Sequence, residues 1–579
     1  MSPRPALFTA TRLQTATYLL AVCLFSIAFL VFVNASISFV VTDLIGRHHG
    51  VGDAVGTLGF ADELLALVAC PAWGMLSDRI GVRWVCTTGY AIVALSLFVF
   101  VQAKNVYPQL LLGRLLFSVG GAAVATMVTA TLPSVSGGSA TWSAGRQPTG
   151  PGCRTSMSSE LTVTPVRYVR STSRDGEVRI EGKPSSSRLA GFVGMFTGCG
   201  ALVALMLFLP LPARFEKMGL SPPEAIQRSY YVVGSIALLV SLVCFIGLRN
   251  LHGDEGKGWR SLGWTYGPYS EDGVQDGERS SAVHTRPLSY FNQLSSAFIL
   301  GFRHTNITLG YLGGFVARAS SVGISLFVPL FVNHYYRESG LCREDPSVLS
   351  EPDMGDIKKS CPKAYILASI LTGVSQLIAL ICAPAFGFLS EKSRNYNLPL
   401  LFAACAGVIG YVAFALLPSP RYDGPQGNLA VFLVMALIGI SQIGAIVCSL
   451  GVLSNGVLHI DSRQAFQDRS GSEAERAPGN GSTSSGPERV PNEEEPLLGK
   501  PSERQFKDLQ HLKGSIAGMY SLYGGAGILI LTKLGGLLFD VLSPGAPFYI
   551  LAAFNGFLLV AGMVCGLATV RSSSLKPQA

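Results

Sequence analysis

The sequence predicts an all-α integral membrane protein, with twelve transmembrane helices in two pseudo-symmetric six-helix bundles. Three observations support this fold class. The 579 residues are 49% hydrophobic and only 14% charged, whereas a soluble domain carries about 25% charged residues. The apolar residues form about twelve blocks, each long enough to cross a hydrocarbon layer of roughly 30 Å. One short motif occurs twice, far apart in the chain.

The repeated motif joins two apolar spans through a turn of only a few residues. The first copy, PAWGMLSDRIGVR, runs from Pro71 to Arg83, and the second, PAFGFLSEK, runs from Pro384 to Lys392. In the fifth and eleventh spans, Gly194-Met-Phe-Thr similarly matches Gly518-Met-Tyr-Ser. We therefore expect two parallel halves related by an axis along the membrane normal.

The first bundle is expected within 17–248 and the second within 303–568. The spans of the first are expected at about 17–41, 56–76, 84–103, 108–132, 189–211 and 230–248. Those of the second are expected at about 307–332, 364–389, 398–417, 429–453, 514–539 and 547–568.

Polar segments connect and flank the spans: an N-tail at 1–16, a central linker at 249–302 and a C-tail at 569–579. Two inserts, 133–188 and 459–513, are rich in small polar residues, and we predict that both are disordered. We expect an interfacial helix at 288–302, because its large apolar side chains share one helical face. They are Leu288, Phe291, Leu294, Phe298 and Phe302.

Lys and Arg residues indicate the orientation. If the N-terminus is cytosolic, 30 of the 44 Lys and Arg residues lie on the cytosolic side, 11 lie opposite and three lie within spans. Both termini are therefore predicted to be cytosolic. In a membrane protein the net charge of +8 needs no nucleic acid partner to explain it, and its placement is more informative than its size.

The first turn resembles a signature of the major facilitator superfamily, G-x-L-x-D-R-x-G-x-R. Its six matching positions are Gly74, Leu76, Asp78, Arg79, Gly81 and Arg83. The run from Arg114 to Ala123 resembles the signature of the fourth span, an arginine followed by small residues. The combination of Phe60-Ala-Asp-Glu-Leu with Tyr107-Pro-Gln-Leu resembles a fungal, drug:proton-antiporter-like branch, although the fifth span lacks the Gly-Pro pair that marks drug antiporters.

The resemblance implies a cytosolic gate, in which Asp78 meets the positive N-terminal end of the eleventh span across the two halves. The residues assigned to this gate are Gly74, Asp78, Arg79, Gly81, Arg83, Gly387 and Glu391. The alternative is a plain short turn, whose basic residues only set the topology.

Four charged residues lie at one depth in the spans, roughly 10 Å below the outer surface. They are Asp62, Glu63, Arg114 and Lys533. Our hypothesis is that Asp62 or Glu63 pairs with Lys533 when the outer side is closed and with Arg114 otherwise. A carboxylate that exchanges partners can change its proton affinity, as proton coupling requires. The alternatives are a static ion pair or side chains that extend to the headgroups.

The resemblance also implies that the first, fourth, seventh and tenth spans line a central cavity. The candidate substrate contacts are therefore Asn34, Arg114, Arg318 and Gln442. A central arginine favours a substrate with a carboxylate or another anionic group. Alternatively, Arg318 pairs with a backbone carbonyl or a neighbouring helix.

Two further features lie outside the spans. Cys342 and Cys361 share one non-cytosolic loop, where we expect a disulfide if the compartment is oxidising; the alternative is two free thiols. Glu493, Leu497 and Leu498 form an acidic dileucine pattern that sorting adaptors would read, or a chance match. The dileucine interpretation favours a vacuolar or lysosomal membrane over the plasma membrane.

These observations predict a secondary active transporter for a small organic solute, with an anion favoured and proton coupling expected. The alternative is a non-transporting solute sensor or scaffold with the same fold. We expect no enzymatic activity, cofactor or metal site, because the sequence contains no nucleophile motif, histidine cluster or metal-ligand spacing. The expected partners are the solute, protons, the lipid bilayer and sorting adaptors, with the chain as a monomer.

Overall fold

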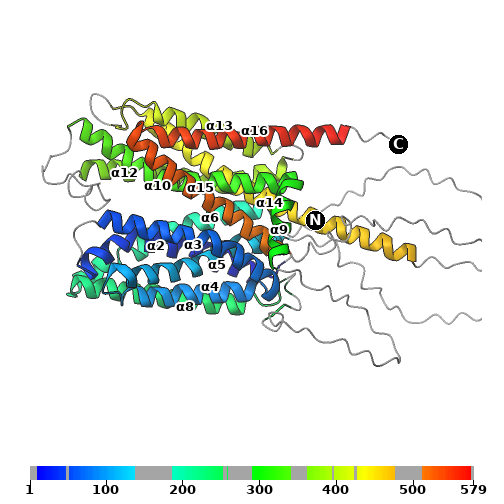
Figure 1. The fold of residues 1–579 in the computed structure, drawn as a ribbon, viewed down its shortest axis with the longest axis horizontal. Coiled ribbons are helices and arrows are strands. Elements are labelled where there is room, and N and C mark those ends of the chain that lie inside the picture. The colour runs from blue at the N-terminus through cyan, green and yellow to red at the C-terminus, as the bar shows by residue number, and fades with distance from the viewer. Residues whose placement is uncertain are drawn as a thin grey trace, which may run out of the picture.

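The computed structural model describes residues 10–46, 51–136, 186–251, 254, 257–258, 290–340, 362–393, 397–422, 427–475 and 512–574. Twelve helical segments within these ranges are long and apolar enough to cross a membrane, as the sequence predicts. They run side by side, with the helices of the first half on one side of the bundle and those of the second half on the other (Figure 1).

The first half contains six spans. The first span combines α1 (Arg12–Ala16), the π-helical η1 (Thr17–Cys23), α2 (Leu24–Phe39) and η2 (Val40–Leu44). The others are α3 (Val51–Ile80), α4 (Val82–Phe100), η3 (Val106–Leu110) with α5 (Leu111–Ser136), α6 (Ser186–Val203) with η4 (Ala204–Phe208), and α8 (Pro222–Gly247), which follows the short α7 (Leu211–Lys217).

The second half begins after α9 (Tyr290–Arg303), which lies at one end of the bundle (Figure 1). Its spans are α10 (Thr305–Glu338), α12 (Pro362–Lys392), α13 (Leu398–Ala415), α14 (Ala430–Glu475), α15 (Lys513–Val541) and α16 (Ala546–Ser574). Because twelve spans form an even number, α1 begins and α16 ends at the same end. We call this the inner end, which the charge distribution predicts to be cytosolic, and the opposite end the outer end.

Some predicted boundaries are corrected by the structure. The insert predicted at 133–188 begins and ends in helix, because α5 continues to Ser136 and α6 begins at Ser186. The insert predicted as disordered at 459–513 begins in helix as well, since α14 continues to Glu475. The helix predicted at 288–302 is observed as α9, Tyr290–Arg303.

Each half has its own aromatic core. In the first half, Tyr230 stacks on Phe100 with ring centroids 5.5 Å apart and also contacts Phe32. In the second half, Phe414 and Phe548 meet edge to face at 4.7 Å. Such aromatic pairs stabilise a core beyond their buried area. The larger cluster of buried apolar residues also includes Ala383 and Ile443 of the second half, so the two bundles pack against each other as well.

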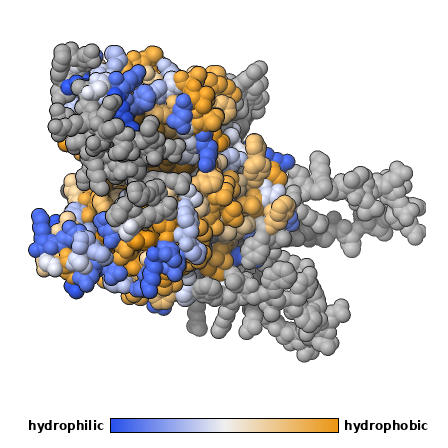
Figure 2. Space-filling model, turned by 60° about the vertical axis from the view of Figure 1, so that its left-hand side comes forward, coloured by the Kyte–Doolittle hydropathy of each residue, from blue (hydrophilic) through white to orange (hydrophobic). Residues whose placement is uncertain are grey.

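The outward face of the spans is apolar. Leu239 on α8 and Phe402 on α13 are 61% and 59% exposed. In the space-filling view, hydrophobic residues spread over the middle of the bundle and hydrophilic residues gather mainly toward one end (Figure 2). A large exposed apolar surface of this kind requires lipid to cover it, which agrees with the membrane assignment.

Candidate functional site

A buried polar cluster occupies the middle of the first half. Arg114 of α5, 3% exposed, forms an ion pair with Asp62 of α3. Its Nη2 also donates a hydrogen bond to Oδ1 of Asn34 on α2. The Nε and Nη1 atoms of Arg114 are buried and have no hydrogen-bond partner. The structure thus brings together three residues that the sequence singled out, and it leaves N–H donors of the guanidinium unused.

Glu63 faces a different direction from Asp62, because adjacent residues on a helix project about 100° apart. It lies within electrostatic reach of Arg318, on α10 of the other half, as well as of Arg114. The stem of Arg318 packs beside Gly524, where an added Cβ would lie 2.7 Å from the Cγ of Arg318. Charged groups from both halves therefore converge near the bundle centre.

The second half supplies uncharged polar groups to this region. Gln442 of α14 donates from Nε2 to Oγ of Ser321 on α10, over 2.9 Å, and accepts a hydrogen bond of 3.2 Å from Gln376 of α12. Ser321 follows Arg318 by three residues, which is close to one helical turn. Gln442, a predicted substrate contact, is therefore held close to Arg318, the residue predicted to bind an anionic group.

Lys533 lies at the interface between the halves toward the outer end. Its Nζ sits 4.1 Å from the centroid of the Phe60 ring on α3, in the geometry of a cation–π contact. In this conformation Asp62 is held by Arg114 instead. The exchange of a carboxylate between Arg114 and Lys533 therefore stays a prediction.

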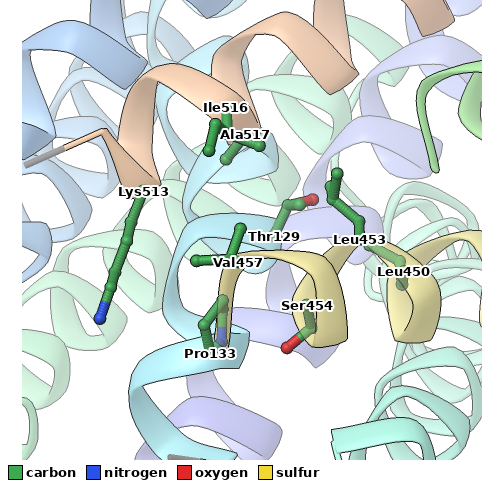
Figure 3. Close-up of a pocket in the computed structure, with 9 residues that line it drawn as sticks. All are labelled: Thr129, Pro133, Leu450, Leu453, Ser454, Val457, Lys513, Ile516 and Ala517. Carbon is green, nitrogen blue, oxygen red and sulfur yellow. The ribbon is translucent and has the colours of Figure 1, made fainter. Parts of the chain in front are cut away.

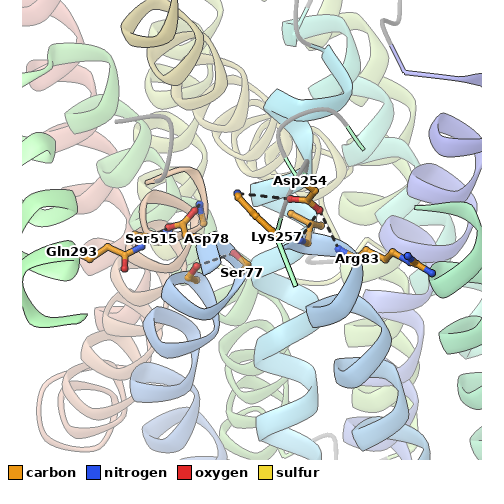
Figure 4. Close-up of polar contacts among 10 residues, drawn as sticks. Ser77, Asp78, Arg83, Asp254, Lys257, Gln293 and Ser515 are labelled. Atoms are coloured by element: carbon orange, nitrogen blue, oxygen red, sulfur yellow. Dashed lines mark hydrogen bonds and ion pairs between the residues drawn. The ribbon is translucent and has the colours of Figure 1, made fainter. Parts of the chain in front are cut away.

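At the inner end, Asp78 binds the beginning of α15 (Figure 4). Its carboxylate accepts hydrogen bonds from the backbone amides of Gly514 and Ser515, at 2.6 and 2.7 Å, and from the Ser515 hydroxyl, at 2.7 Å. Gln293 of α9 donates a fourth hydrogen bond, at 3.0 Å. We call Asp78, Gln293, Gly514 and Ser515 the inner latch. The contact implied by the family resemblance is thus present.

Close backbone approach makes this latch possible. A Cβ on Gly74 would lie 3.0 Å from the Cα of Gly518, and a Cβ on Gly518 would lie 2.9 Å from the Cα of Pro71. Real Cβ atoms cannot be accommodated at such distances without a shift of the backbone. Gly74 therefore lets α3 reach α15 closely enough for Asp78 to meet the helix N-terminus.

The turn between α3 and α4 is capped from the central linker. Gly81 has a φ of 93°, a conformation that favours glycine. Asp254 accepts a hydrogen bond from the backbone amide of Val82, at 2.9 Å, and forms an ion pair with Lys257 at 3.8 Å. Burial raises the pKa of the Asp254 carboxyl, while Lys257 and the backbone amides oppose that rise.

The basic residue Arg83 of this turn makes its contacts within the first half. Arg83 donates from Nε to the backbone carbonyl of Phe245, at 2.8 Å. Its guanidinium carbon lies 4.1 Å from the centroid of the Phe245 ring. Arg79 is half-buried. Arg83 therefore ties α4 to the inner end of α8 rather than to the second half.

The second copy of the motif makes an equivalent contact, from an acidic residue of the second half to the beginning of a span in the first half. Glu391 of α12 forms an ion pair with Arg188 of α6, and both side chains are partly exposed. A Cβ on Gly191 would lie 2.9 Å from the Cα of Gly387. Two pairs of spans, α3 with α15 and α12 with α6, therefore close the inner end.

A small cavity behind the latch shows how tight this closure is (Figure 3). Its volume is about 10 Å³, enough for roughly one water molecule. Thr129 of α5, Ser454 of α14 and Lys513 of α15 are among the residues that line it. Helices of both halves thus meet around it and leave little free space.

Several residues of this region were not identified by sequence reasoning. They are Arg188, Asp254, Gln293, Ser321 and Gln376. Arg188 was assigned to a polar insert, Asp254 to the central linker, and Gln293 to the polar face of the predicted interfacial helix. The repeat itself could have indicated Arg188, since Glu391 needs a partner at the start of α6 if Asp78 has one at the start of α15.

Two predicted features lie outside the described residues. They are the disulfide between Cys342 and Cys361 and the dileucine pattern of Glu493, Leu497 and Leu498.

Comparison with known proteins adds evidence for part of the chain. Residues 24–141 match the family model described as Major Facilitator Superfamily. Over 89 residues the chain is 37% identical to the MFS-type transporter oryN of Aspergillus oryzae (strain ATCC 42149 / RIB 40), which is 15% of this chain and 17% of that protein. The chain thus matches this curated relative over only about a sixth of the relative's length.

Solved structures resemble nearly the whole fold. The transporter FucP in the outward conformation superposes with a TM-score of 0.54 at 12% identity, over 95% of this chain and 98% of FucP. The proton:xylose symporter XylE bound to 6-bromo-6-deoxy-D-glucose superposes with a TM-score of 0.50 at 10% identity, over 95% and 94% of the two chains. At these identities the likeness concerns the fold alone, which is that of twelve spans in two bundles.

Proposed function

We propose that this chain belongs to the major facilitator superfamily, and that it is a secondary active transporter that moves a small organic solute by alternating access. The observation that carries the proposal is the meeting of charged groups from both halves at the bundle centre. Asp62, Glu63 and Arg114 come from the first half and Arg318 from the second. Charges inside a membrane bundle are costly and are kept where they serve a pathway.

An anionic solute fits this centre best. Two buried nitrogen atoms of Arg114, Nε and Nη1, have no hydrogen-bond partner. Among the described residues, Arg318 takes part in no ion pair and donates no hydrogen bond. A carboxylate that bridges the two guanidinium groups would satisfy these donors and would contact both halves at once. Ser321, Gln376 and Gln442 would supply hydrogen bonds to the uncharged part of the solute.

Proton coupling would use the two neighbouring carboxylates. Asp62 is paired with Arg114 in this conformation, whereas Glu63 faces the other half. When the halves rock, Arg318 and Lys533 move relative to α3, so the positive charge near each carboxylate changes. A carboxylate whose neighbours change in this way binds and releases a proton during the cycle.

The inner latch and the pair Arg188–Glu391 support an outward-facing assignment for this conformation. Both contacts join the two halves at the inner end. In the proposed cycle, both contacts break when the inner end opens.

Flux into liposomes tests the proposal. The purified chain is reconstituted, an inward proton gradient is imposed, and uptake of a panel of labelled small carboxylates and matched neutral analogues is measured. We expect uptake of at least one carboxylate, which Arg318→Gln abolishes and Arg214→Gln, an exposed arginine on α7, leaves intact. Saturable binding without flux would instead favour the solute sensor. Uptake that is unaffected by Arg318→Gln would exclude the anion contact.

A second experiment separates coupling from transport. Asp62→Asn together with Glu63→Gln should leave binding measurable and remove the dependence of uptake on the proton gradient. If uptake remains gradient-driven in this double variant, the two carboxylates do not carry the proton.

We also propose an integral membrane location with both termini in the cytosol, in the vacuolar or lysosomal membrane if the dileucine pattern is used. Microscopy of the tagged chain with Leu497→Ala and Leu498→Ala tests this. A shift to the plasma membrane on mutation supports the pattern, and an unchanged plasma-membrane signal discards it.

A further inference from the structure

Helix α9 exposes its aromatic face and buries a polar side chain. Phe291, Phe298 and Phe302 are 79%, 43% and 70% exposed, and their spacing of seven and four residues places them along one side of the helix. On the opposite side, Gln293 is 4% exposed. A helix on a water-facing surface shows the reverse arrangement, with its polar side outward.

The buried side of α9 belongs to the inner latch. Gln293 donates its hydrogen bond to Asp78, and Ala297 and Leu300 pack into the hydrophobic core behind it. Farther along the helix, Phe298 stacks on Tyr523 of α15 with centroids 6.4 Å apart. The position of α9 on the bundle therefore determines whether Gln293 reaches Asp78.

The place of α9 in the fold indicates what covers its exposed side. The helix ends at Arg303, and α10, a membrane span, begins at Thr305. The end of α9 therefore lies near the depth at which α10 enters the membrane, where aromatic side chains are favoured. Because Phe298 in this stripe stacks on Tyr523, the stripe also adjoins α15, a second membrane span.

We propose that lipid of the inner-end leaflet covers the aromatic face of α9 and thereby holds Gln293 on Asp78. The bilayer is then a structural partner of the inner latch. Weak contact between α9 and lipid releases Gln293, and the first turn of α15 loosens. This inference concerns the membrane contact and does not depend on which solute the chain carries, or on whether it transports one.

Photo-crosslinking tests the lipid contact. The photoreactive residue p-benzoyl-phenylalanine is placed at position 291 or 302, and at the buried position 300 as the control, in full-length protein reconstituted into phosphatidylcholine and phosphatidylserine vesicles. We expect lipid adducts at 291 and 302 and adducts within the protein at 300. Adducts at 291 and 302 that map to another segment of this chain would overturn the proposal, because that segment would then cover the face.

Hydrogen–deuterium exchange tests the coupling. In lipid nanodiscs, Phe291→Gln with Phe302→Gln should raise the exchange rate of backbone amides 513–520 severalfold, and Gln293→Ala should do the same. The matched variant Phe291→Trp with Phe302→Trp, which keeps interfacial aromatic rings, should leave exchange unchanged. If the glutamine variant loses its lipid contact yet exchanges like the wild type, lipid does not hold the latch.

Discussion

Arg188 and Glu391 form an ion pair at the inner end that is the counterpart, in the second half, of the contact between Asp78 and Ser515 in the first. In both cases an acidic residue at the end of one span reaches the beginning of a span in the other half. The two contacts differ in burial, however. Asp78 is 5% exposed, whereas the side chains of Arg188 and Glu391 are 38% and 29% exposed.

This difference predicts unequal effects of neutralising the two acids. Asp78→Asn should destabilise the closed inner end by about 1.5–3 kcal/mol, the usual range for hydrogen bonds to a charged group. Glu391→Gln should cost only about 0.2–1 kcal/mol, because water screens a partly exposed pair. Amide exchange at 513–520 and at 186–193 measures the two effects.

The control for this comparison is Asp540→Asn, an exposed acid near the other end of α15. It should leave exchange at 513–520 unchanged. Equal effects of Asp78→Asn and Glu391→Gln would mean that the two contacts share the closure evenly despite their different burial.

A second prediction concerns the close approach of α12 and α6. A Cβ on Gly387 would lie 2.8 Å from the Cα of Gly191, so Gly387→Val should force the spans apart. Overpacking of this kind costs about 1–3 kcal/mol. We expect a lower thermal unfolding midpoint and faster exchange at 186–193.

Gly373 provides the matched control on the same helix, because a Cβ there would meet nothing within 4 Å. Gly373→Val carries the same change in helix propensity without the clash. If both valine variants lose the same stability, helix propensity and not close packing explains the result.

The sequence predicted the fold well because the governing signals are local. Each span is a continuous apolar block, and the turn between α3 and α4 carries its own glycines and charges. The repeat was also visible, but its register was not. In the structure Gly74 packs against Gly518, and Gly387 packs against Gly191, so Gly191 is the counterpart of Gly518. The sequence match had instead paired Gly518 with Gly194, three residues later. Similar residues recur at nearly every turn of such spans, so identity alone could not choose the register.

The candidate site was predictable only in part. Charges inside spans stand out against an apolar background, which is why Asp62, Arg114 and Arg318 were found. Asp254 and Gln293 were not, because each lies in a polar stretch where many similar residues occur. Only the packing of the linker against the inner end distinguishes them from their neighbours.

A third prediction concerns the buried ion pair of Asp62 and Arg114. Removing one partner leaves the other charge buried and uncompensated, so Asp62→Asn and Arg114→Gln should each cost about 3–5 kcal/mol. The double variant should cost clearly less than the sum of the two, because neither charge then remains. Thermal unfolding of all four proteins in one detergent gives this double-mutant cycle. Additive losses would show that the two side chains are not coupled.

The last prediction is a pH effect at Asp254. Its native pKa is raised by burial, so the folded protein binds this proton more tightly than the unfolded chain does. The carboxyl therefore favours folding most below its unfolded pKa of about 3.9, and this contribution is lost as the pH rises toward the native pKa. The positive groups that face it are Lys257 and, from α15, Lys513.

Wild type should therefore gain thermal stability relative to Asp254→Asn as the pH is lowered from 7 toward 4.5. Lys257→Met should extend this dependence to higher pH, because it removes the nearest charge that favours the ionised carboxylate. A difference between wild type and Asp254→Asn that does not vary with pH would mean that the carboxyl titrates alike in the folded and unfolded states. In that case Asp254 would act on the turn through its hydrogen bonds to Val82 and Arg83 alone.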